Sequence, residues 1–414
     1  MTSPSAQTRL LAGPTLSAGA ESRRDHLARL GPLPSAAARR DIIPTLEASG
    51  LLGRGGAGFP VGRKWRTVAE RAAGGTVVLV NGAEGEPLSA KDRALMTLRP
   101  NLVLDGAQVA ADAVGADEVI LYVGSAHVTA RWSIEAALAE RGGSLTVPTR
   151  VVQAPDRYVA GEESAAVHFV NDADARPTTT PPRPFERGIG GRPTLVQNVE
   201  SIAYAALIAR AGDDWYRAAG RADSPGTGLV TVSGVARPGV REIELGATVG
   251  EVALAAGAGR DAAPAVLIGG YFGGWATLDE AWDLALDPAG LRAAGRAFGC
   301  GVVSFLAPDT CGVTATARIM DYMAGESAAQ CGPCVFGLRA IADATARLAG
   351  GTAGSDDLAR IERWSGQLAG RGACRHPDGA VGLLASALRV FGDEFVRHGA
   401  ARTCTVGGRR RVAA

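Results

Sequence analysis

In the first half of the chain, short apolar runs alternate with longer segments in which apolar residues recur at helical spacing. Residues 76–80 form one such run between Gly75 and Asn81-Gly82, which predicts a buried strand. Residues 100–114 show the helical pattern and are followed by a glycine. Further strands are expected at 118–123 and 145–152, and further helices at 36–49, 64–73 and 134–141. This alternation is typical of an α/β domain with a largely parallel sheet.

The pattern changes near residues 222–228, where Ser, Pro and Gly gather. Short β-rich segments follow at 229–235, 240–244, 265–268 and 302–305, and helical periodicity then fills 314–324, 335–349, 356–368 and 380–398. The first residues are rich in Ser, Ala, Gly and Pro. We therefore expect a flexible arm at 1–35, an α/β domain at 36–225, a small β domain at 226–308 and a helical bundle at 309–414.

Composition narrows the possible partners. The chain has 414 residues, of which 46% are hydrophobic and 21% charged, as in soluble globular proteins. The formal net charge of +1 provides no basic field, so nucleic acid is not an expected partner. No apolar run reaches the roughly 18 residues of a membrane span, and the N-terminus lacks a signal-peptide core, so we expect a cytoplasmic protein. The six cysteines then suit metal or redox chemistry better than a disulfide framework.

A glycine-rich loop, Gly53-Arg-Gly-Gly-Ala-Gly58, matches the spacing of dinucleotide-binding loops. The preceding residues 44–49 are expected to be helical, whereas that fingerprint requires a strand there, so an ordinary Rossmann motif is not indicated. Consecutive glycines still expose backbone N–H groups to a phosphate, and Arg54 and Lys64 add positive charge. A purely structural glycine loop is the alternative.

Two carboxylates and an amide follow the strand at 76–80, in Asn81-Gly-Ala-Glu-Gly-Glu-Pro87. The carboxyl ends of parallel strands are where α/β domains bind ligands. Asn81, Glu84 and Glu86 are therefore candidate ligand-binding residues. A solvated acidic loop is the alternative.

Five motifs in order make the chain similar to one family. They are the Gly53–Gly58 loop with Phe59-Pro60 and Lys64-Trp65, Asn81-x-x-Glu-x-Glu-Pro87 with Lys91-Asp-Arg93, Tyr158-x-x-Gly-Glu-Glu163, Arg192-Pro-Thr-x-x-x-Asn-Val-Glu200, and Glu326-Ser to Cys334 with Cys374. Together they resemble the NADH-oxidising FMN and iron–sulfur flavoprotein subunit of respiratory complex I, which also occurs in NAD-reducing hydrogenases and formate dehydrogenases. The resemblance runs from about Gly50 to the C-terminus.

The resemblance implies an FMN-binding α/β domain, a small β-grasp domain (the soluble-ligand-binding type) and a C-terminal α-helical bundle that holds an iron–sulfur cluster. The implied cofactor-binding residues are Gly53, Arg54, Gly55, Gly56, Lys64, Asn81, Glu84, Tyr158, Gly161, Glu162, Val196 and Asn198. Phe59, Glu86 and Glu163 would contact NADH, and Glu86 and Glu163 are the expected catalytic residues. Arg183 is a further candidate substrate-binding residue that departs from the family pattern. The reaction would be hydride transfer from NADH to FMN, followed by single-electron transfer onward.

Several positions depart from the family pattern. Ala83 stands where the family has Asp, and Gln197 where it has Asn. Thr180 and Arg183 stand where the family has the Lys and Phe that hold NADH. FMN binding is therefore the stronger expectation, and Arg183 leaves open a preference for the extra phosphate of NADPH.

Cys331-Gly-Pro-Cys334 has two interpretations. It matches a thioredoxin redox pair, but that motif requires a preceding strand, whereas residues 324–330 lie between expected helices. The family instead uses four cysteines for a [4Fe–4S] cluster. This chain supplies Cys331, Cys334 and Cys374, and Ala328 replaces the first ligand.

Three outcomes follow for the cluster: a [4Fe–4S] cluster with another fourth ligand, a [3Fe–4S] cluster, or no cluster. Ser327 is next to the missing ligand, but on a helix its side chain would point about 100° away. Cys311 could approach only by rearrangement, and Cys300 and Cys404 are expected to be a core residue and a tail thiol. The five histidines show no ligand spacing.

The expected function is that of an NADH:acceptor oxidoreductase that passes electrons to a protein such as a ferredoxin or a membrane-associated reductase. The second would place the protein at the inner face of the cell membrane. One alternative is a degenerate, non-catalytic component of a larger redox complex, which Ala83, Thr180 and Ala328 favour. Another is ligand binding by the β-grasp domain, which Ser233-Gly-Val-Ala-Arg-Pro-Gly239 favours.

Overall fold

The computed structural model describes residues 8–15, 19–72 and 74–406. The chain divides into two compact units. The first comprises Met1–Thr231, Val240–Ala247 and Asp287–Ala289, and the second comprises Val232–Gly239, Thr248–Leu286 and Gly290–Ala414. The expected small β domain and helical bundle thus fall mainly into one unit rather than two.

The first unit contains a four-stranded sheet with the order β3-β2-β1-β4. Its strands are β1 Thr76–Gly82, β2 Ala116–Gly124, β3 Thr149–Ala154 and β4 Thr194–Asn198. Each neighbouring pair is parallel, and Leu79 of β1 is in register with Ile120 and Val196. The prediction of a parallel α/β sheet is confirmed. Because all strands run the same way, their carboxyl ends meet at one edge.

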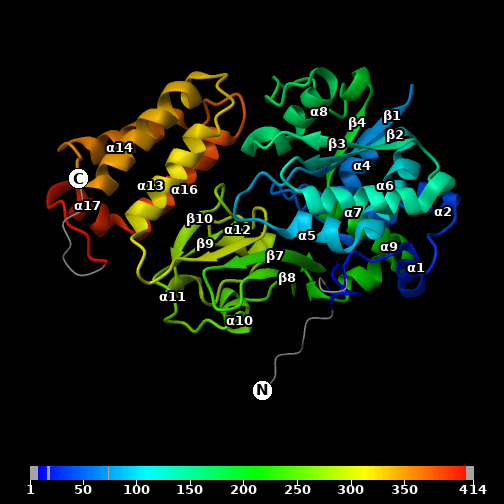
Figure 1. Cartoon of the computed structure of the whole chain (residues 1–414), viewed down its shortest axis with the longest axis horizontal. Helices are drawn as coiled ribbons and strands as arrows, with labels where there is room; N and C mark the ends of the chain where they lie inside the picture. Colours follow the sequence, from blue (N-terminus) through cyan, green and yellow to red (C-terminus); the bar gives the residue numbers. More distant parts are fainter. Residues whose placement is uncertain (1–7, 16–18, 73, 407–414) are drawn as a thin grey trace. The chain divides into compact units, whose positions relative to one another are not determined.

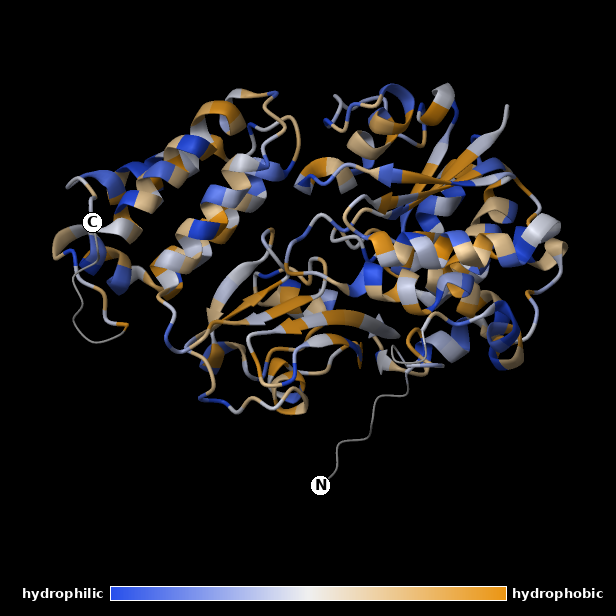
Figure 2. Cartoon of the chain, in the orientation of Figure 1, coloured by the Kyte–Doolittle hydropathy of each residue, from blue (hydrophilic) through white to orange (hydrophobic). Residues whose placement is uncertain are grey.

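Helices cover both faces of this sheet because its strands are apolar on both sides (Figures 1 and 2). Val78 and Val80 face one core, to which α6 Pro100–Val114 and α9 Val199–Arg217 contribute. Val77 and Leu79 face the other, which α8 Glu163–Asp172 covers. The other described helices of this unit are α1 Arg23–Leu30, α2 Ala36–Arg40, α3 Ile43–Ser49, α4 Val61–Ala69, α5 Lys91–Leu98 and α7 Val128–Arg141. Strands β5 Gly220–Arg221 and β6 Ser224–Pro225 form a short antiparallel pair.

The helix expected at 36–49 is two helices, α2 and α3. Pro44 lies in the first turn of α3. Proline has no N–H to continue a preceding helix and fits the start of a new one, which accounts for the break.

The expectation of a flexible arm is wrong for the described part of residues 1–35, and residues 1–7 and 16–18 lie outside the described residues. The side chain of Leu10 is fully buried. The Glu242 carboxylate accepts hydrogen bonds from the backbone N–H groups of Arg9, Leu10 and Leu11, at 2.9–3.0 Å. Arg99 donates to the carbonyl oxygens of Leu11 and Ala12 at 2.8 Å. These partners lie far along the sequence, so composition alone did not reveal them.

A second sheet has the order β10-β9-β11-β7-β8. Its strands are β7 Thr227–Ser233, β8 Gly239–Glu244, β9 Ala265–Ile268, β10 Gly274–Thr277 and β11 Val302–Phe305, and the helices between them are α10 Val249–Ala255, α11 Leu278–Ala281 and α12 Pro288–Ala293. Strand β9 is antiparallel to both β10 and β11. The four expected β segments are therefore present, and β10 is an additional strand for which no expectation was stated.

The C-terminal part is helical, as expected. It consists of α13 Gly312–Gly325, a π-helical turn Pro333–Leu338, α14 Arg339–Gly350, α15 Asp357–Leu368, α16 His376–Val390 and α17 Gly392–Ala400. The helix expected at 380–398 is interrupted at Phe391, where φ is −114° and ψ is 20°. Among the described residues, no helix combines the length and apolar character needed to cross a bilayer.

Candidate functional site

Four segments of the first unit meet at the carboxyl edge of the parallel sheet. They are the glycine loop at 53–58, the end of β1, the turn at 158–163 after β3, and the end of β4. Asn81 on β1 donates a 2.8 Å hydrogen bond from Nδ2 to the carbonyl oxygen of Gly161. A Cβ at Gly55 would lie 3.4 Å from the Cβ of Asn198. The structure thus brings together residues from all four predicted segments.

A backbone hydrogen bond joins the two ends of the glycine loop, and two of its glycines border open space. Gly53 N–H donates to the carbonyl of Phe59 at 2.8 Å. Gly56 and Gly58 have φ of 108° and 65°, the left-handed region that glycine adopts readily. A Cβ at either position would meet no atom of the described chain within 4 Å. The loop therefore borders open space that a phosphate could enter, and its backbone can approach such a group closely.

Arg54 anchors this loop to the core of the first unit. The residue is 3% exposed, and Nη2 donates to the Tyr216 hydroxyl at 3.1 Å and the Thr227 carbonyl at 3.2 Å. Its Nε lies 3.8 Å from a Glu200 oxygen. The sequence led us to expect this positive charge beside the loop, but its partners hold it in the core. Arg54 is an anchor of the loop in this geometry.

Lys64 and Glu163 form an ion pair that joins α4 to the first turn of α8. Their side chains are 22% and 30% exposed, so both remain accessible. The neighbouring Glu162 caps α8 and accepts from the backbone N–H groups of Ser164 and Ala165 at 2.9 Å. The N-terminus of α8, a favourable place for anions, is therefore occupied by the protein's own carboxylate.

The turn after β1 packs tightly against the turn after β3. A Cβ at Gly85 would lie 2.6 Å from the Tyr158 carbonyl oxygen, so only glycine fits there. The Tyr158 hydroxyl donates to Oε2 of Glu86 at 3.0 Å, and Glu86 is 9% exposed. These contacts hold the Glu86 carboxylate at the carboxyl edge, next to the turn that carries Glu163.

Glu84 turns its carboxylate toward the start of α5. It accepts from the backbone N–H groups of Asp92 at 2.9 Å and Arg93 at 3.0 Å, and from Ser89 Oγ at 2.7 Å. Burial and the Asp92 carboxylate raise the pKa of Glu84 above its usual range. Glu84 also has a φ of 43°, unusual for a residue with a side chain. It therefore stabilises the bend of this turn as well as the helix.

Lys91, Asp92 and Glu200 belong to the sequence motifs but had no expected role. Asn198 Nδ2 donates to Asp92 at 2.7 Å, and Lys91 Nζ lies 2.7 Å from Asp92 and 3.0 Å from Glu200. Burial opposes the charge of Lys91, but Asp92 and Glu200 raise its pKa well above the usual value. This buried network ties the end of β4 to α5. The signal for it in the sequence was the charged residues of the motifs Lys91-Asp-Arg93 and Asn198-Val-Glu200.

The remaining predicted residues occupy varied surroundings. Phe59 is 48% exposed beside the glycine loop, Val196 is 4% exposed in β4, and Arg183 is exposed in the loop before β4. Gln197 is buried, and its Oε1 has no hydrogen-bond partner among the described residues. Ala83 lies 3.5 Å from the Cβ position of Gly161. The open glycine loop and the unpaired Gln197 oxygen fit a polar ligand, so the residues present are compatible with FMN.

The predicted cluster ligands lie in the second unit. Cys334 is 4% exposed in the π-helical turn, and burial together with the Cys331 and Cys374 thiols raises its pKa to about 12. The Ser327 hydroxyl hydrogen-bonds to Cys334 and opposes this increase. Ser327 lies beyond the end of α13, so the helical orientation argued from sequence does not apply. Three thiols and one hydroxyl therefore share one neighbourhood, which fits a cluster with three cysteine ligands.

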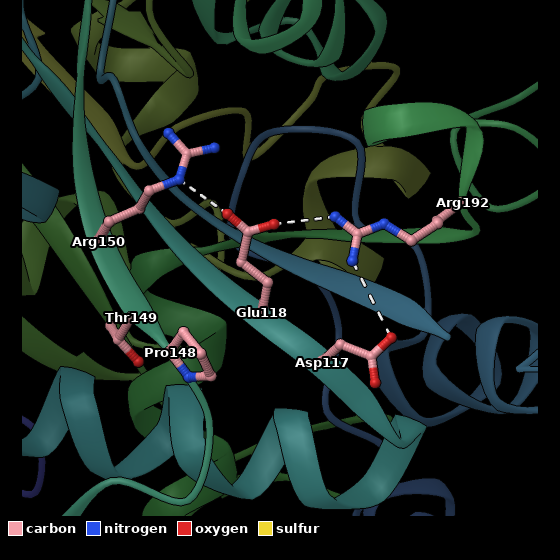
Figure 3. A pocket seen from close by; sticks show the side chains of 6 residues that line it. All are labelled: Asp117, Glu118, Pro148, Thr149, Arg150 and Arg192. Atoms are coloured by element: carbon pink, nitrogen blue, oxygen red, sulfur yellow. Dashed lines mark hydrogen bonds and ion pairs between the residues drawn. The ribbon is translucent and has the colours of Figure 1, made fainter. Parts of the chain in front are cut away.

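A separate cavity of about 270 Å³ lies at the amino ends of β2 and β3 (Figure 3). Glu118 lies between two arginines there, 2.7 Å from Arg150 and 2.9 Å from Arg192, and Arg192 reaches Asp117 at 4.0 Å. Partial burial opposes the shift, but the two arginines lower the pKa of Glu118. The charges of this cavity thus neutralise one another.

Comparisons with known proteins agree with this geometry. Residues 46–206 match the Nuo51 FMN-binding domain, and residues 314–398 match the NADH-ubiquinone oxidoreductase-F iron–sulfur binding region. The second NADH-quinone oxidoreductase F subunit of Rhizobium meliloti is 32% identical over 379 residues, 88% of this chain and 90% of the relative. The corresponding F subunit of Mycobacterium tuberculosis is 33% identical, over 86% of this chain and 84% of its own.

Solved structures give the same result. A crystal structure of an NAD+-reducing [NiFe]-hydrogenase in the air-oxidised state matches with a TM-score of 0.81 and 30% identity. The match covers 91% of this chain and 66% of that chain. The H2-reduced state matches with a TM-score of 0.78 and 29% identity. The predicted resemblance, the FMN-binding domain and the iron–sulfur region are confirmed, and the chain belongs to the family of the F subunits of NADH-quinone oxidoreductases, FMN- and iron–sulfur-containing electron-transfer flavoproteins that oxidise NADH.

Proposed function

We propose that this chain oxidises NADH at the carboxyl edge of its parallel sheet and delivers the electrons to a protein acceptor through the cysteine region. The observation that carries the proposal is the meeting of the glycine loop, Asn81, the turn at 158–163 and Asn198 at one edge. FMN, when bound, supplies a two-electron acceptor for hydride that can release electrons singly. The residues of the chain supply binding, orientation and charge.

In this proposal, the backbone N–H groups of the loop at 53–58 and the Lys64 ammonium bind the cofactor phosphate. Asn81, Tyr158, Gly161, Glu162, Val196 and Asn198 line the rest of the cofactor site. Arg54 and Glu84 act as positioning residues, because their charged groups are already engaged by Tyr216 and by the N-terminus of α5. The unpaired Gln197 oxygen is available as an additional acceptor at the end of β4.

Glu86, Glu163, Phe59 and Arg183 are proposed to bind the nicotinamide nucleotide. A carboxylate accepts hydrogen bonds from ribose hydroxyls and repels a 2′-phosphate, so Glu86 and Glu163 favour NADH over NADPH. Glu163 is accessible and already paired with Lys64, which places one negative and one positive group side by side. Arg183 is exposed and is the feature that favours NADPH.

Cys331, Cys334 and Cys374 are proposed as the protein ligands of the cluster. The Ser327 hydroxyl, which hydrogen-bonds to Cys334, is proposed as the oxygen that takes the position left by Ala328. The second sheet and α10 are proposed to form the β-grasp domain of the family. The acceptor is proposed to be a protein of a multi-subunit redox complex, which would hold the chain at the inner face of a membrane. The relatives are named as subunits of quinone oxidoreductases, and this supports the proposal.

The test is anaerobic addition of NADH, and separately NADPH, to the FMN-reconstituted full chain while the visible flavin absorbance is recorded. We expect rapid bleaching with NADH and slower bleaching with NADPH. The alternative of a degenerate, non-catalytic chain, supported by Ala83 and Thr180, requires that FMN bind and remain oxidised with both nucleotides. That result would contradict the proposal.

A further inference from the structure

A second group of metal-ligating side chains lies in the second unit, outside the three cluster thiols. It consists of Cys311, Glu394, His398 and Cys404, and their ligand atoms all lie within 4.8 Å of one another. Cys311 is the N-cap residue of α13, Glu394 and His398 are one turn apart on α17, and Cys404 follows α17. Cys311 and His398 are buried. Three separate places along the chain thus converge on one point.

The spacing of the ligand atoms suits a single tetrahedral ion. Cys311 Sγ lies 3.5 Å from His398 Nε2, and Nε2 lies 3.3 Å from Glu394 Oε1. Zinc bonds to sulfur at about 2.3 Å and to nitrogen or oxygen at about 2.0–2.2 Å, so tetrahedral ligands are separated by roughly 3.3–3.8 Å. These two distances match that geometry, and all four ligand atoms lie within 4.8 Å of one another.

His398 and Glu394 are held in place by hydrogen bonds to their non-ligating atoms or to neighbouring groups, as metal ligands commonly are. His398 Nδ1 lies 3.0 Å from the carbonyl oxygen of Leu348, which fixes the proton on Nδ1 and leaves the Nε2 lone pair facing the cysteines. The Glu394 carboxylate is held by Thr405, whose N–H donates to Oε1 at 2.8 Å and whose hydroxyl donates to Oε2 at 2.7 Å. Imidazole and carboxylate are therefore both oriented by backbone or hydroxyl partners.

We propose that Cys311, Glu394, His398 and Cys404 bind one Zn²⁺ in a structural site that shares no ligand with the predicted cluster thiols Cys331, Cys334 and Cys374. Two thiolates, one imidazole and one carboxylate form a closed set of four protein ligands, which is typical of structural zinc. Thiolate and imidazole ligands in a tetrahedral arrangement select zinc over magnesium or calcium. The ion would fasten the segment after α17 to the start of α13, and the proposal does not depend on NADH oxidation.

A disulfide between Cys311 and Cys404 is the main competing arrangement. It would use neither His398 nor Glu394, although both ligand atoms point to the same place as the thiols. A metal accounts for all four side chains. A group of hydrogen-bonded side chains without an ion is the second alternative.

The experiment measures zinc and iron in the full chain, produced with both metals supplied and purified anaerobically without chelators. We expect about one zinc per chain in the native protein, by elemental mass spectrometry. Cys404→Ser, which lies beyond the last helix and should fold, and His398→Ala should each weaken zinc binding more than about tenfold in chelator competition. Cys300→Ser is the matched control, because this partly buried cysteine lies outside both groups. The Cys300→Ser variant should keep its zinc.

A second arm separates this site from the cluster. Replacement of Cys331 and Cys334 by serine should lower iron and leave zinc unchanged. Zinc-edge X-ray absorption of the native protein should show two sulfur ligands at about 2.3 Å and two nitrogen or oxygen ligands at about 2.0–2.2 Å. Absence of zinc from the native protein, loss of zinc with the Cys331/Cys334 variant, or a Cys311–Cys404 disulfide in the intact mass would each overturn the proposal.

Discussion

The two edges of the parallel sheet carry similar residue types in different electrostatic arrangements. At the amino edge, Glu118 is held between Arg150 and Arg192, and the charges cancel locally (Figure 3). At the carboxyl edge, the glycine loop leaves its backbone facing open space, and the buried Gln197 oxygen has no partner among the described residues. One edge is satisfied by its own side chains, and the other has polar groups available to a ligand.

The difference follows from strand direction. Each turn at the carboxyl edge leads from a strand toward a helix, so backbone N–H groups gather there, as in other α/β ligand sites. A hollow such as the cavity of about 270 Å³ at the amino edge does not identify the functional site by itself. The availability of unsatisfied polar groups is the better criterion.

The largest expected effect is loss of FMN in Gly56→Val. The position has a φ of 108°, which a β-branched residue adopts only with strain, and the new side chain would enter the open space at the loop. We expect FMN affinity to fall by at least about 100-fold, or about 2.7 kcal/mol, in a fluorescence titration.

Gly142→Val is the matched control for this variant. Gly142 also has a positive φ, 52°, and a Cβ there meets no described atom within 4 Å, but it lies after α7, away from the loop. Equal loss of FMN in both variants would show that the loss does not depend on the position of Gly56 in the glycine loop, and would contradict the assignment of the carboxyl edge as the FMN site.

The next effect is on nucleotide binding. Glu86→Ala should raise the KM for NADH while FMN stays bound, because the proposed ribose acceptor is removed. Loss of a hydrogen bond to a charged group is worth about 1.5–3 kcal/mol, which corresponds to roughly 10–150-fold. Tyr158→Phe removes only the hydroxyl that donates to Glu86 and should give a smaller increase in KM. Equal loss of FMN and NADH in Glu86→Ala would instead make Glu86 a structural residue.

Sequence patterns predicted helices and strands that depend on neighbouring residues, and missed side-chain arrangements that depend on residues far along the chain. The helix at 100–114 and the strands at 265–268 and 302–305 were predicted with their observed bounds, because proline, glycine and apolar periodicity are local signals. The buried orientation of Arg54 depends on Tyr216 and Thr227, which no local pattern reveals.

The cysteine groups show the same limit. Cys331, Cys334 and Cys374 were identified through family motifs, whereas Cys404 was expected to be a tail thiol. Its spatial neighbour Cys311 lies far earlier in the chain, before α13, and His398 is linked to Cys311 only by the fold. Three-dimensional convergence was needed to recognise the group.

A smaller effect is expected at the amino edge. Glu118→Gln should leave FMN affinity and NADH kinetics unchanged. It should lower the free energy of unfolding by no more than about 1 kcal/mol, because partly exposed ion pairs contribute little. Urea unfolding and NADH-dependent flavin bleaching of the same preparation measure both quantities. A large loss of NADH oxidation would show that the amino edge participates in function.

The smallest effect is a pH dependence of opposite sign at the two edges. The pKa of Glu118 is lowered by its arginines, so its contribution to stability is present above its unfolded pKa and is lost as the pH falls through its folded pKa. The pKa of Glu84 is raised by burial and by Asp92, so its contribution is present below its unfolded pKa and is lost as the pH rises through its folded pKa. Relative to Glu118→Gln, the native chain should therefore gain stability from about pH 4 to about pH 7, and relative to Glu84→Gln it should lose stability over the same range. Urea unfolding of the native chain and both variants without FMN, at about pH 4 and about pH 7, measures these stability differences. If both differences change with pH in the same direction, the opposite pKa shifts of Glu118 and Glu84 are contradicted.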